Sequence, residues 1–133
     1  MPDQLRLATR TRGLAAIVQA RGTLDLHGAT DFDREIDRLL RGETREILVD
    51  LRQIEFMDSL GLRSLVRAHR VALRAGVPLW VVRGNAPVVT QVLRMTGLDV
   101  TLPLIDDLPG RLQGRRRPLA VAQREMRISS GNR

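Results

Sequence analysis

The feature that most constrains the fold is a strand–helix–strand pattern in the middle of the chain. Two short segments are almost continuously apolar, as is typical of strands covered on both faces: residues 47–51 and residues 78–82. Between them, residues 59–75 carry apolar side chains at helical spacing, and Gly76 supplies a stop. This order predicts two parallel strands joined by a right-handed helical crossover. The helix stripe expected to be buried consists of Leu62, Leu65, Val66 and Leu73.

The segment before this unit predicts a hairpin and a helix. Apolar and polar residues alternate through residues 5–7, and a second apolar stretch spans residues 14–20 after a turn at residues 11–13. A helix is then expected to begin at the N-cap Thr30, where the acidic residues that follow suit the positive end of a helix dipole. It is expected to end at Gly42.

The segment after the unit predicts one more helix and a last short strand. Asn85 is expected to cap the helix, Pro87 lies in its first turn and Gly97 ends it. A short strand is expected at residues 100–102. The chain is therefore predicted to form one small α/β domain over residues 1–110, a mixed sheet of four or five strands packed with about four helices.

The positive charge is concentrated at the end of the sequence. The 133 residues include 22 basic side chains, all of them arginine, and 15 acidic ones, for a net charge of +7. Residues 1–110 hold 15 arginines against 14 acidic residues, whereas residues 111–133 hold 7 arginines against one glutamate. The second segment is expected to be a basic, flexible tail. Binding of this tail to RNA or to a membrane is an alternative, but no specific binding of nucleic acid is expected, because the three aromatic side chains lie in apolar segments of the body.

The composition excludes several kinds of chemistry. The chain has no cysteine and no lysine, which rules out disulfides, thiolate zinc sites, a Schiff-base lysine and a Walker phosphate loop. The two histidines show no metal-ligand spacing, so neither a metal nor a cofactor is expected. No stretch approaches the roughly twenty apolar residues of a membrane span, and no signal peptide is apparent. A cytoplasmic protein without a membrane span is expected.

Ser59 is the obvious candidate nucleophile, but no base accompanies it. His69 lies ten residues further along the same predicted helix, about 15 Å away at about 1.5 Å per residue, beyond reach of the Ser59 hydroxyl. His27 lies in the loop before the first predicted helix, where only the tertiary fold decides its distance from Ser59. Nothing resembles the Gly-x-Ser-x-Gly turn of a hydrolase. The chain is therefore not expected to be an enzyme.

Two aspartates follow predicted strands. Asp25 and Asp58 stand where α/β domains place their binding loops, at the ends of strands. The alternative is purely structural, because capping residues are expected wherever a helix starts, and Asp58 or Ser59 can serve as that cap.

A longer pattern surrounds Ser59. Residues 56–62, Phe-Met-Asp-Ser-Leu-Gly-Leu, preceded by Val-Asp-Leu at 49–51, resemble the signature of the STAS family, the anti-sigma factor antagonists. Three further segments resemble the family in the expected order: residues 22–25, 75–79 and 93–99. Together they extend from residue 5 to about residue 108, and the tail has no counterpart. The resemblance implies a STAS-like domain.

The resemblance also implies a role for each residue of this loop. Ser59 aligns with the serine that a partner phosphorylates in the family. Asp25, Asp58, Leu60 and Gly61 are then expected on the partner-binding surface. Leu60 departs from the family pattern, because members commonly carry Ser or Thr after the acceptor, and it adds a large apolar group to the loop.

The partners follow from the same resemblance. The expected partner is an anti-sigma factor with GHKL-type serine kinase activity, and a PP2C-type phosphatase is expected to reset the switch. The unphosphorylated form would bind the anti-sigma factor and release a sigma factor, and phosphorylation of Ser59 would end that binding. An alternative keeps the fold and changes the role, to an accessory subunit of a membrane transporter or a scaffold subunit of a signalling complex.

Overall fold

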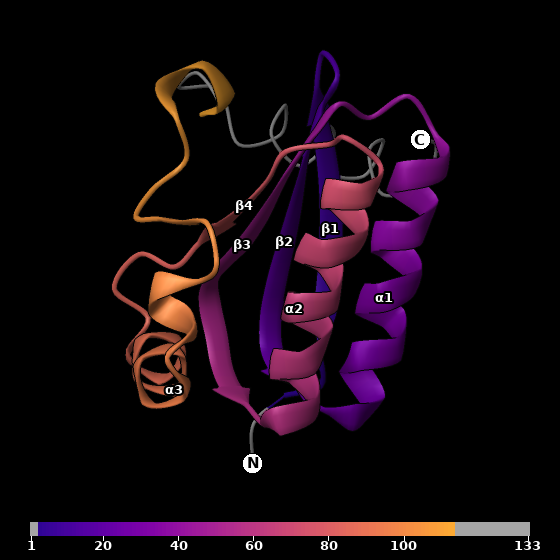
Figure 1. Ribbon diagram of the computed structural model, residues 1–133. Coiled ribbons are helices and arrows are strands. Elements are labelled where there is room, and N and C mark those ends of the chain that lie inside the picture. The colour runs from indigo at the N-terminus through magenta and orange to yellow at the C-terminus, as the bar shows by residue number, and fades with distance from the viewer. Residues whose placement is uncertain (1–2, 114–133) are drawn as a thin grey trace.

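A five-stranded sheet in chain order organises residues 3–113, the part of the chain that the computed structural model describes (Figure 1). β1 runs antiparallel to β2, and each later pair of neighbours is parallel, as the crossover pattern predicted. The strands are β1 (Arg6–Arg12), β2 (Ala15–Leu24), β3 (Glu46–Met57), β4 (Leu79–Val82) and β5 (Leu104–Ile105).

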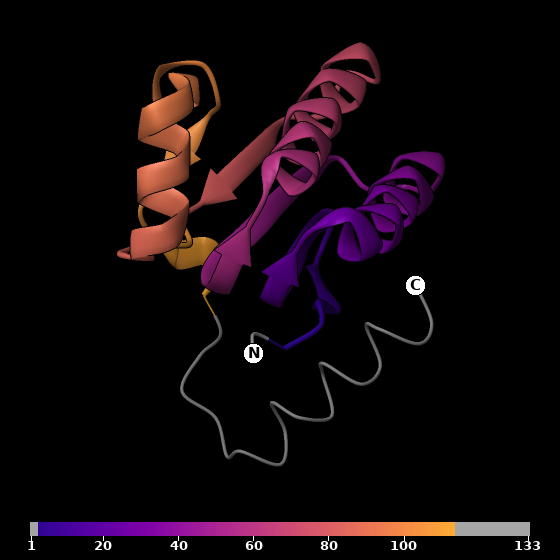
Figure 2. The same ribbon diagram turned by 90° about the horizontal axis from the view of Figure 1, so that it is seen from below.

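The helices of the described part are fewer than expected, three instead of about four, accompanied by two short 3₁₀ helices. They are α1 (Leu26–Arg41), α2 (Ser59–Arg74) and α3 (Pro87–Thr96), with η1 (Leu98–Val100) and η2 (Gly110–Leu112). Figure 2 shows the three α-helices on one side of the sheet. Alternate residues of β3 point to that side, so Ile47, Val49 and Leu51 join Phe32 of α1 and Leu65 of α2 in a fully buried core. The predicted mixed α/β architecture is confirmed.

Residues 106–113, which we call the C-terminal strap, cover part of the opposite face of the sheet. Leu108 and Leu112 of the strap pack against Ile17, Leu48 and Val82 of the strands, and these five side chains are buried. The strap therefore closes a second, smaller core.

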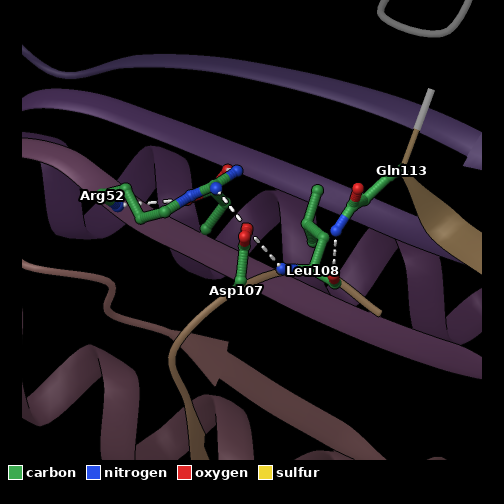
Figure 3. A network of polar contacts seen from close by, with 5 residues as sticks. Arg52, Asp107, Leu108 and Gln113 are labelled. Carbon is green, nitrogen blue, oxygen red and sulfur yellow. Dashed lines mark hydrogen bonds and ion pairs between the residues drawn. The ribbon is translucent and has the colours of Figure 1, made fainter. Parts of the chain in front are cut away.

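Polar contacts hold the strap in place (Figure 3). Arg52 donates from Nη1 to the Asp107 carboxylate at 2.6 Å and from Nη2 to the Asp50 carboxylate at 2.8 Å. The Gln113 side chain donates to the backbone carbonyl of Leu108 at 2.8 Å. One arginine thus links the strap to a buried carboxylate of β3.

Arg111 of the strap forms an ion pair with Glu46 of β3. Its guanidinium donates to both carboxylate oxygens of Glu46, at 2.9 and 2.8 Å, and this bonding lowers the pKa of Glu46 although burial acts against it. Packing thus continues past Gly110, the end of the domain expected from sequence, as far as Gln113. The rest of the expected tail, residues 114–133, lies outside the described residues.

The prediction for the start of the first helix was wrong. α1 begins at Leu26 instead of after Thr30, because the Asp25 carboxylate caps it by accepting hydrogen bonds from the backbone N–H groups of His27 and Gly28. His27 therefore lies in the first turn of the helix and not in a preceding loop.

Two predictions near the end of the domain were also wrong. The residue at the N-cap position of α3 is Ala86, without a side-chain hydrogen bond, so Asn85 does not cap the helix. The last strand lies at Leu104–Ile105 instead of residues 100–102, because that pair is in register with Val81 and Val82 of β4.

The buried stripe of α2 also differs from the predicted one. Leu73 is 63% exposed, and Ala68 and Ala72 are buried in its place. At about 100° per residue, Ala72 returns almost to the direction of Leu65, whereas Leu73 points about 80° away from it. A small residue facing the sheet was not recognised as part of the stripe.

Candidate functional site

β2 and β3 end side by side, which brings the two predicted aspartates to the same end of the sheet. Leu24 and Met57 are partners in the parallel register, and each is followed directly by an aspartate, Asp25 and Asp58. The backbone N–H of Asp58 donates to the carbonyl of Leu24 at 3.3 Å. This hydrogen bond joins the turn between β3 and α2 to the turn between β2 and α1. The starts of α1 and α2 therefore lie next to each other.

Both aspartates cap the helix that follows them. The Oδ1 atom of Asp58 accepts hydrogen bonds from the backbone N–H groups of Leu60 and Gly61, both at 3.0 Å. Asp25 accepts the corresponding pair from His27 and Gly28, both at 3.1 Å. Each carboxylate so satisfies two of the N–H groups that the first turn of a helix leaves unpaired, and adds a negative charge at the positive end of the helix dipole.

Each of the two helix starts contains a glycine that packs closely against the sheet. A Cβ atom on Gly61 would lie 2.0 Å from the carbonyl oxygen of Leu24. One on Gly28 would lie 2.8 Å from the Cβ of Leu5 and 3.0 Å from the carbonyl oxygen of Thr23. The first turns of both helices thus approach the sheet so closely that a side chain would not fit without movement.

Ser59 occupies the first position of α2 and is exposed. Its hydroxyl has no hydrogen-bond partner within residues 3–113, because Asp58 and not Ser59 caps the helix. The choice left open by the sequence, a cap at Asp58 or at Ser59, is decided in favour of Asp58. The hydroxyl is therefore available to a protein that approaches this edge.

Two apolar side chains near these strand and helix ends are exposed. Leu26, the first residue of α1, is 57% exposed, and Phe56, near the end of β3, is 45% exposed. Leu60 is half-buried, and Gly61 is buried.

Within residues 3–113 no hydrogen bond joins either histidine to the Ser59 hydroxyl. His69 lies on α2, ten residues beyond Ser59, or about 15 Å along the helix axis. Within residues 3–113 no three His, Cys, Asp or Glu side chains gather as a metal site. None of the helices in this described range has the length and apolarity needed to cross a membrane.

The sequence reasoning missed Gly28 and the capping role of Asp25. A signal for both was present, because Asp25-Leu26-His27-Gly28 repeats the Asp-x-x-Gly spacing of residues 58–61. Only the second copy stands before an obvious apolar helix stripe.

Residues 7–106 match a family model described as "Mlab, STAS domain". The anti-sigma F factor antagonist of Paenibacillus polymyxa is 29% identical over 92 residues, which cover 68% of this chain and 78% of the relative. The anti-sigma-F factor antagonist RsfB of Mycobacterium tuberculosis is 26% identical over 116 residues, covering 85% of this chain and 91% of RsfB.

Solved structures agree with this match. An anti-sigma factor antagonist from Mycobacterium paratuberculosis has a TM-score of 0.73 at 24% identity, over 84% of this chain and 94% of that one. SpoIIAA in its unphosphorylated form has a TM-score of 0.65 at 21% identity, over 79% of this chain and 89% of its own. The phosphorylated form of SpoIIAA, a Bacillus cell fate determinant, gives 0.61 at 20% identity, over 79% and 92%. These likenesses confirm the fold.

Proposed function

The chain belongs to the STAS domain family, and on that premise we propose that it is a cytoplasmic anti-sigma factor antagonist switched by phosphorylation of Ser59. The unphosphorylated form binds an anti-sigma factor with GHKL-type serine kinase activity, and the sigma factor is released. The kinase modifies Ser59 and the complex separates. A PP2C-type phosphatase restores the binding form.

The relatives support the role. Both curated relatives carry the name of an anti-sigma F factor antagonist, and each is matched over more than three quarters of its own length. SpoIIAA is known in an unphosphorylated and a phosphorylated form, so this fold accommodates a phosphate in at least one protein.

One observation carries the choice of Ser59. Its hydroxyl is exposed at the first position of α2 and engaged by no other group within residues 3–113. A kinase can therefore reach it without unfolding the helix start, because the cap is supplied by Asp58.

Local charge supports the direction of the switch. A phosphate adds about −1.5 to −2 charges at neutral pH. The N–H groups of Leu60 and Gly61, which would otherwise bind an anion at a helix N-terminus, are already taken by the Asp58 carboxylate. The phosphate therefore adds negative charge beside an existing carboxylate, and a docked partner would have to desolvate it. The fold survives because the modified side chain is exposed.

Asp25, Asp58, Leu60 and Gly61 have a shared role in this proposal. The aspartates and Gly61 hold the two helix starts in place, and the apolar side chain of Leu60 contributes contact area to the partner surface. Leu60 replaces a small polar residue that is common at this position in the family, so the partner is expected to present a matching apolar group. Catalytic activity of the chain's own has no part in this mechanism.

The test is capture followed by phosphorylation. The unmodified full chain is used to retain its partner from the native lysate, and the purified partner is incubated with the chain and ATP. We expect a GHKL-type kinase and a single phosphate on Ser59 by mass spectrometry. Thr30→Ala, which removes another exposed hydroxyl near a helix start, serves as a matched control and is expected to be labelled like the wild type.

Two results would contradict the proposal. Labelling of Ser59→Ala as complete as that of the wild type would exclude Ser59 as the acceptor. Retention of a transporter subunit in place of a kinase would favour the alternative role as an accessory subunit.

A further inference from the structure

The outer edge of β1 is a long strand edge that the Ser59 site does not use. β1 stands first in the sheet order, and among residues 3–113 no strand pairs with its outer side. It runs for seven residues, whereas β5 at the opposite edge has two. Every second residue of such an edge directs its backbone N–H and C=O outward, ready to pair with another strand.

Arginines line this edge on the face of the sheet opposite the helices. Leu5 and Leu7 pack toward the helix-side core, so the alternate residues Arg6, Arg10 and Arg12 lie on the other face. Arg6 is also directly opposite Arg21 of β2. Like charges in opposing positions repel each other. The hollow beside this pair is lined by three arginines, Arg6, Arg21 and Arg52, and by two acidic residues, Asp3 and Glu55.

Arginines of α1 line the same edge on the helix side. Arg34, Arg38 and Arg41 border a hollow of about 390 Å³ whose other wall includes Leu7 and Thr9 of β1. Their spacing of four and then three residues puts them on one face of the helix. The hollow lies beside Leu7 and Thr9 of β1, so a chain added to this strand would pass these arginines.

The arginines that line the hollow outnumber its acidic residues, so a net positive charge remains there. Glu35 accepts hydrogen bonds from Thr9 and Arg38; burial opposes its ionisation, but these two partners outweigh burial and lower its pKa. Asp31 is the other acidic residue of the hollow. Arg34 and Arg41 have no ion-pair partner within the described residues.

We propose that the outer edge of β1 binds an acidic protein segment in extended conformation, which adds a sixth strand to the sheet. The backbone of the edge supplies the main-chain hydrogen bonds that hold an added strand. Because successive side chains of a strand alternate between the two faces, acidic residues on such a segment reach arginines on both sides of β1.

Other occupants fit this edge less well. A second copy pairing through β1 would bring rows of arginine together. Residues 114–133 of this chain contain six arginines and one glutamate, so they carry the same sign of charge as the edge. Nucleic acid lacks the peptide groups that pair with a strand edge, and no aromatic side chain is available here for stacking, because Phe32 is buried and Phe56 and Trp80 lie on β3 and β4.

The experiment uses the ¹⁵N-labelled full chain and a soluble peptide of alternating glutamate and threonine, about nine residues long. We expect chemical-shift changes at the amides of residues 6–12, slower exchange of the outward N–H groups, and binding that weakens as salt is added. Arg6→Glu combined with Arg34→Glu changes one exposed arginine in each row and is expected to weaken binding at least about tenfold.

Matched controls separate strand addition from nonspecific charge. Arg70→Glu combined with Arg94→Glu makes the same charge change at exposed positions of α2 and α3, and is expected to leave peptide binding within about twofold of the wild type. A peptide of alternating glutamate and proline keeps the charge but lacks most N–H donors, and is expected to bind much more weakly.

Four outcomes would overturn the proposal. They are no binding of the glutamate–threonine peptide, shift changes that fall outside β1 and α1, equal loss in the two double variants, and equal binding of the proline peptide. Tighter binding of a short DNA duplex at the same residues would instead indicate a nucleic-acid surface. None of these results bears on the phosphorylation of Ser59, because β1 contributes no residue to that site.

Discussion

The junction between β2 and α1 and the junction between β3 and α2 have the same construction and different surfaces. In each, an aspartate follows the strand, caps the helix through two backbone N–H groups and is followed three residues later by a buried glycine. The residue after the aspartate is Leu26 in one and Ser59 in the other. The shared parts therefore belong to the fold, and the chemical difference between the junctions lies in the two positions between aspartate and glycine, which are Leu26 and His27 in one and Ser59 and Leu60 in the other.

The junctions also differ in what their glycines touch. The Cβ that an alanine would place at Gly61 lies 2.0 Å from the backbone carbonyl oxygen of Leu24, whereas at Gly28 the nearest atoms, the Cβ of Leu5 and the carbonyl oxygen of Thr23, lie 2.8 and 3.0 Å away. The junction that carries the serine is thus the more tightly constrained of the two.

Gly61→Ala is expected to have the largest effect on stability. A contact of 2.0 Å with the carbonyl of Leu24 forces the helix start away from the sheet, and the free energy of unfolding is expected to fall by about 3 kcal/mol or more. Gly28→Ala should cost less, about 1 to 2 kcal/mol, because its contacts of 2.8 to 3.0 Å with Leu5 and Thr23 require a smaller movement. Urea denaturation of both variants measures the difference. A loss at Gly28 equal to that at Gly61 would show that the two helix starts are equally constrained.

Ser59→Asp is expected to have the next largest effect, on partner binding. A carboxylate at this position imitates part of the charge of a phosphate beside Asp58, and desolvating it in an interface costs about 2 kcal/mol or more. Ser59→Ala adds no charge and should bind like the wild type. Calorimetry with the purified partner compares the two. Equal affinities at moderate salt would place Ser59 outside the interface.

Asp58→Ala and Asp25→Ala are expected to cost similar, smaller amounts of stability. Each removes a cap that satisfies two N–H groups, and loss of such a cap costs about 1 kcal/mol. Thermal unfolding of the two variants, with Asp31→Ala as an exposed control in α1, tests this equality. A much larger loss for one aspartate would mean that its carboxylate does more than cap.

Ser59→Ala is expected to have the smallest effect on stability, within about 0.5 kcal/mol of the wild type. The hydroxyl makes no hydrogen bond in the described part of the chain, and alanine is a good helix former. The same variant should accept no phosphate from the cognate kinase. A drop of 1 kcal/mol or more in denaturant unfolding would reveal a contact of the serine in solution that the helix start does not account for.

The sequence predicted the second junction well and the first poorly, for a physical reason. After Asp58, Leu62 and Leu65 indicate a buried helix face close to the helix start. The apolar pattern of the strand ends at Met57. After Asp25 the next residues, Leu26 and His27, are exposed, and the first large core residue of α1 is Phe32. A helix whose first turn packs through Gly28 and Ala29 gives no apolar stripe until its second turn.

The C-terminal strap could not be predicted for a different reason. Leu108 and Leu112 are isolated leucines in a segment with Pro109 and Gly110, so they show neither helical nor strand periodicity. Their burial depends on the apolar face formed by strands far away in the sequence, with Arg52 of β3 as the anchor for Asp107. Local patterns carry no information about such a contact.

The position of the strap has a consequence for the synthesis of the protein on the ribosome. Domains generally begin to fold while the chain is emerging, starting from the N-terminal side. β1 to β4 and all three α-helices emerge from the ribosome before residues 106–113, so Ile17, Leu48 and Val82 face water until the strap emerges. During that interval the nascent chain presents an apolar sheet face, the kind of surface that chaperones recognise and that makes incomplete chains aggregate.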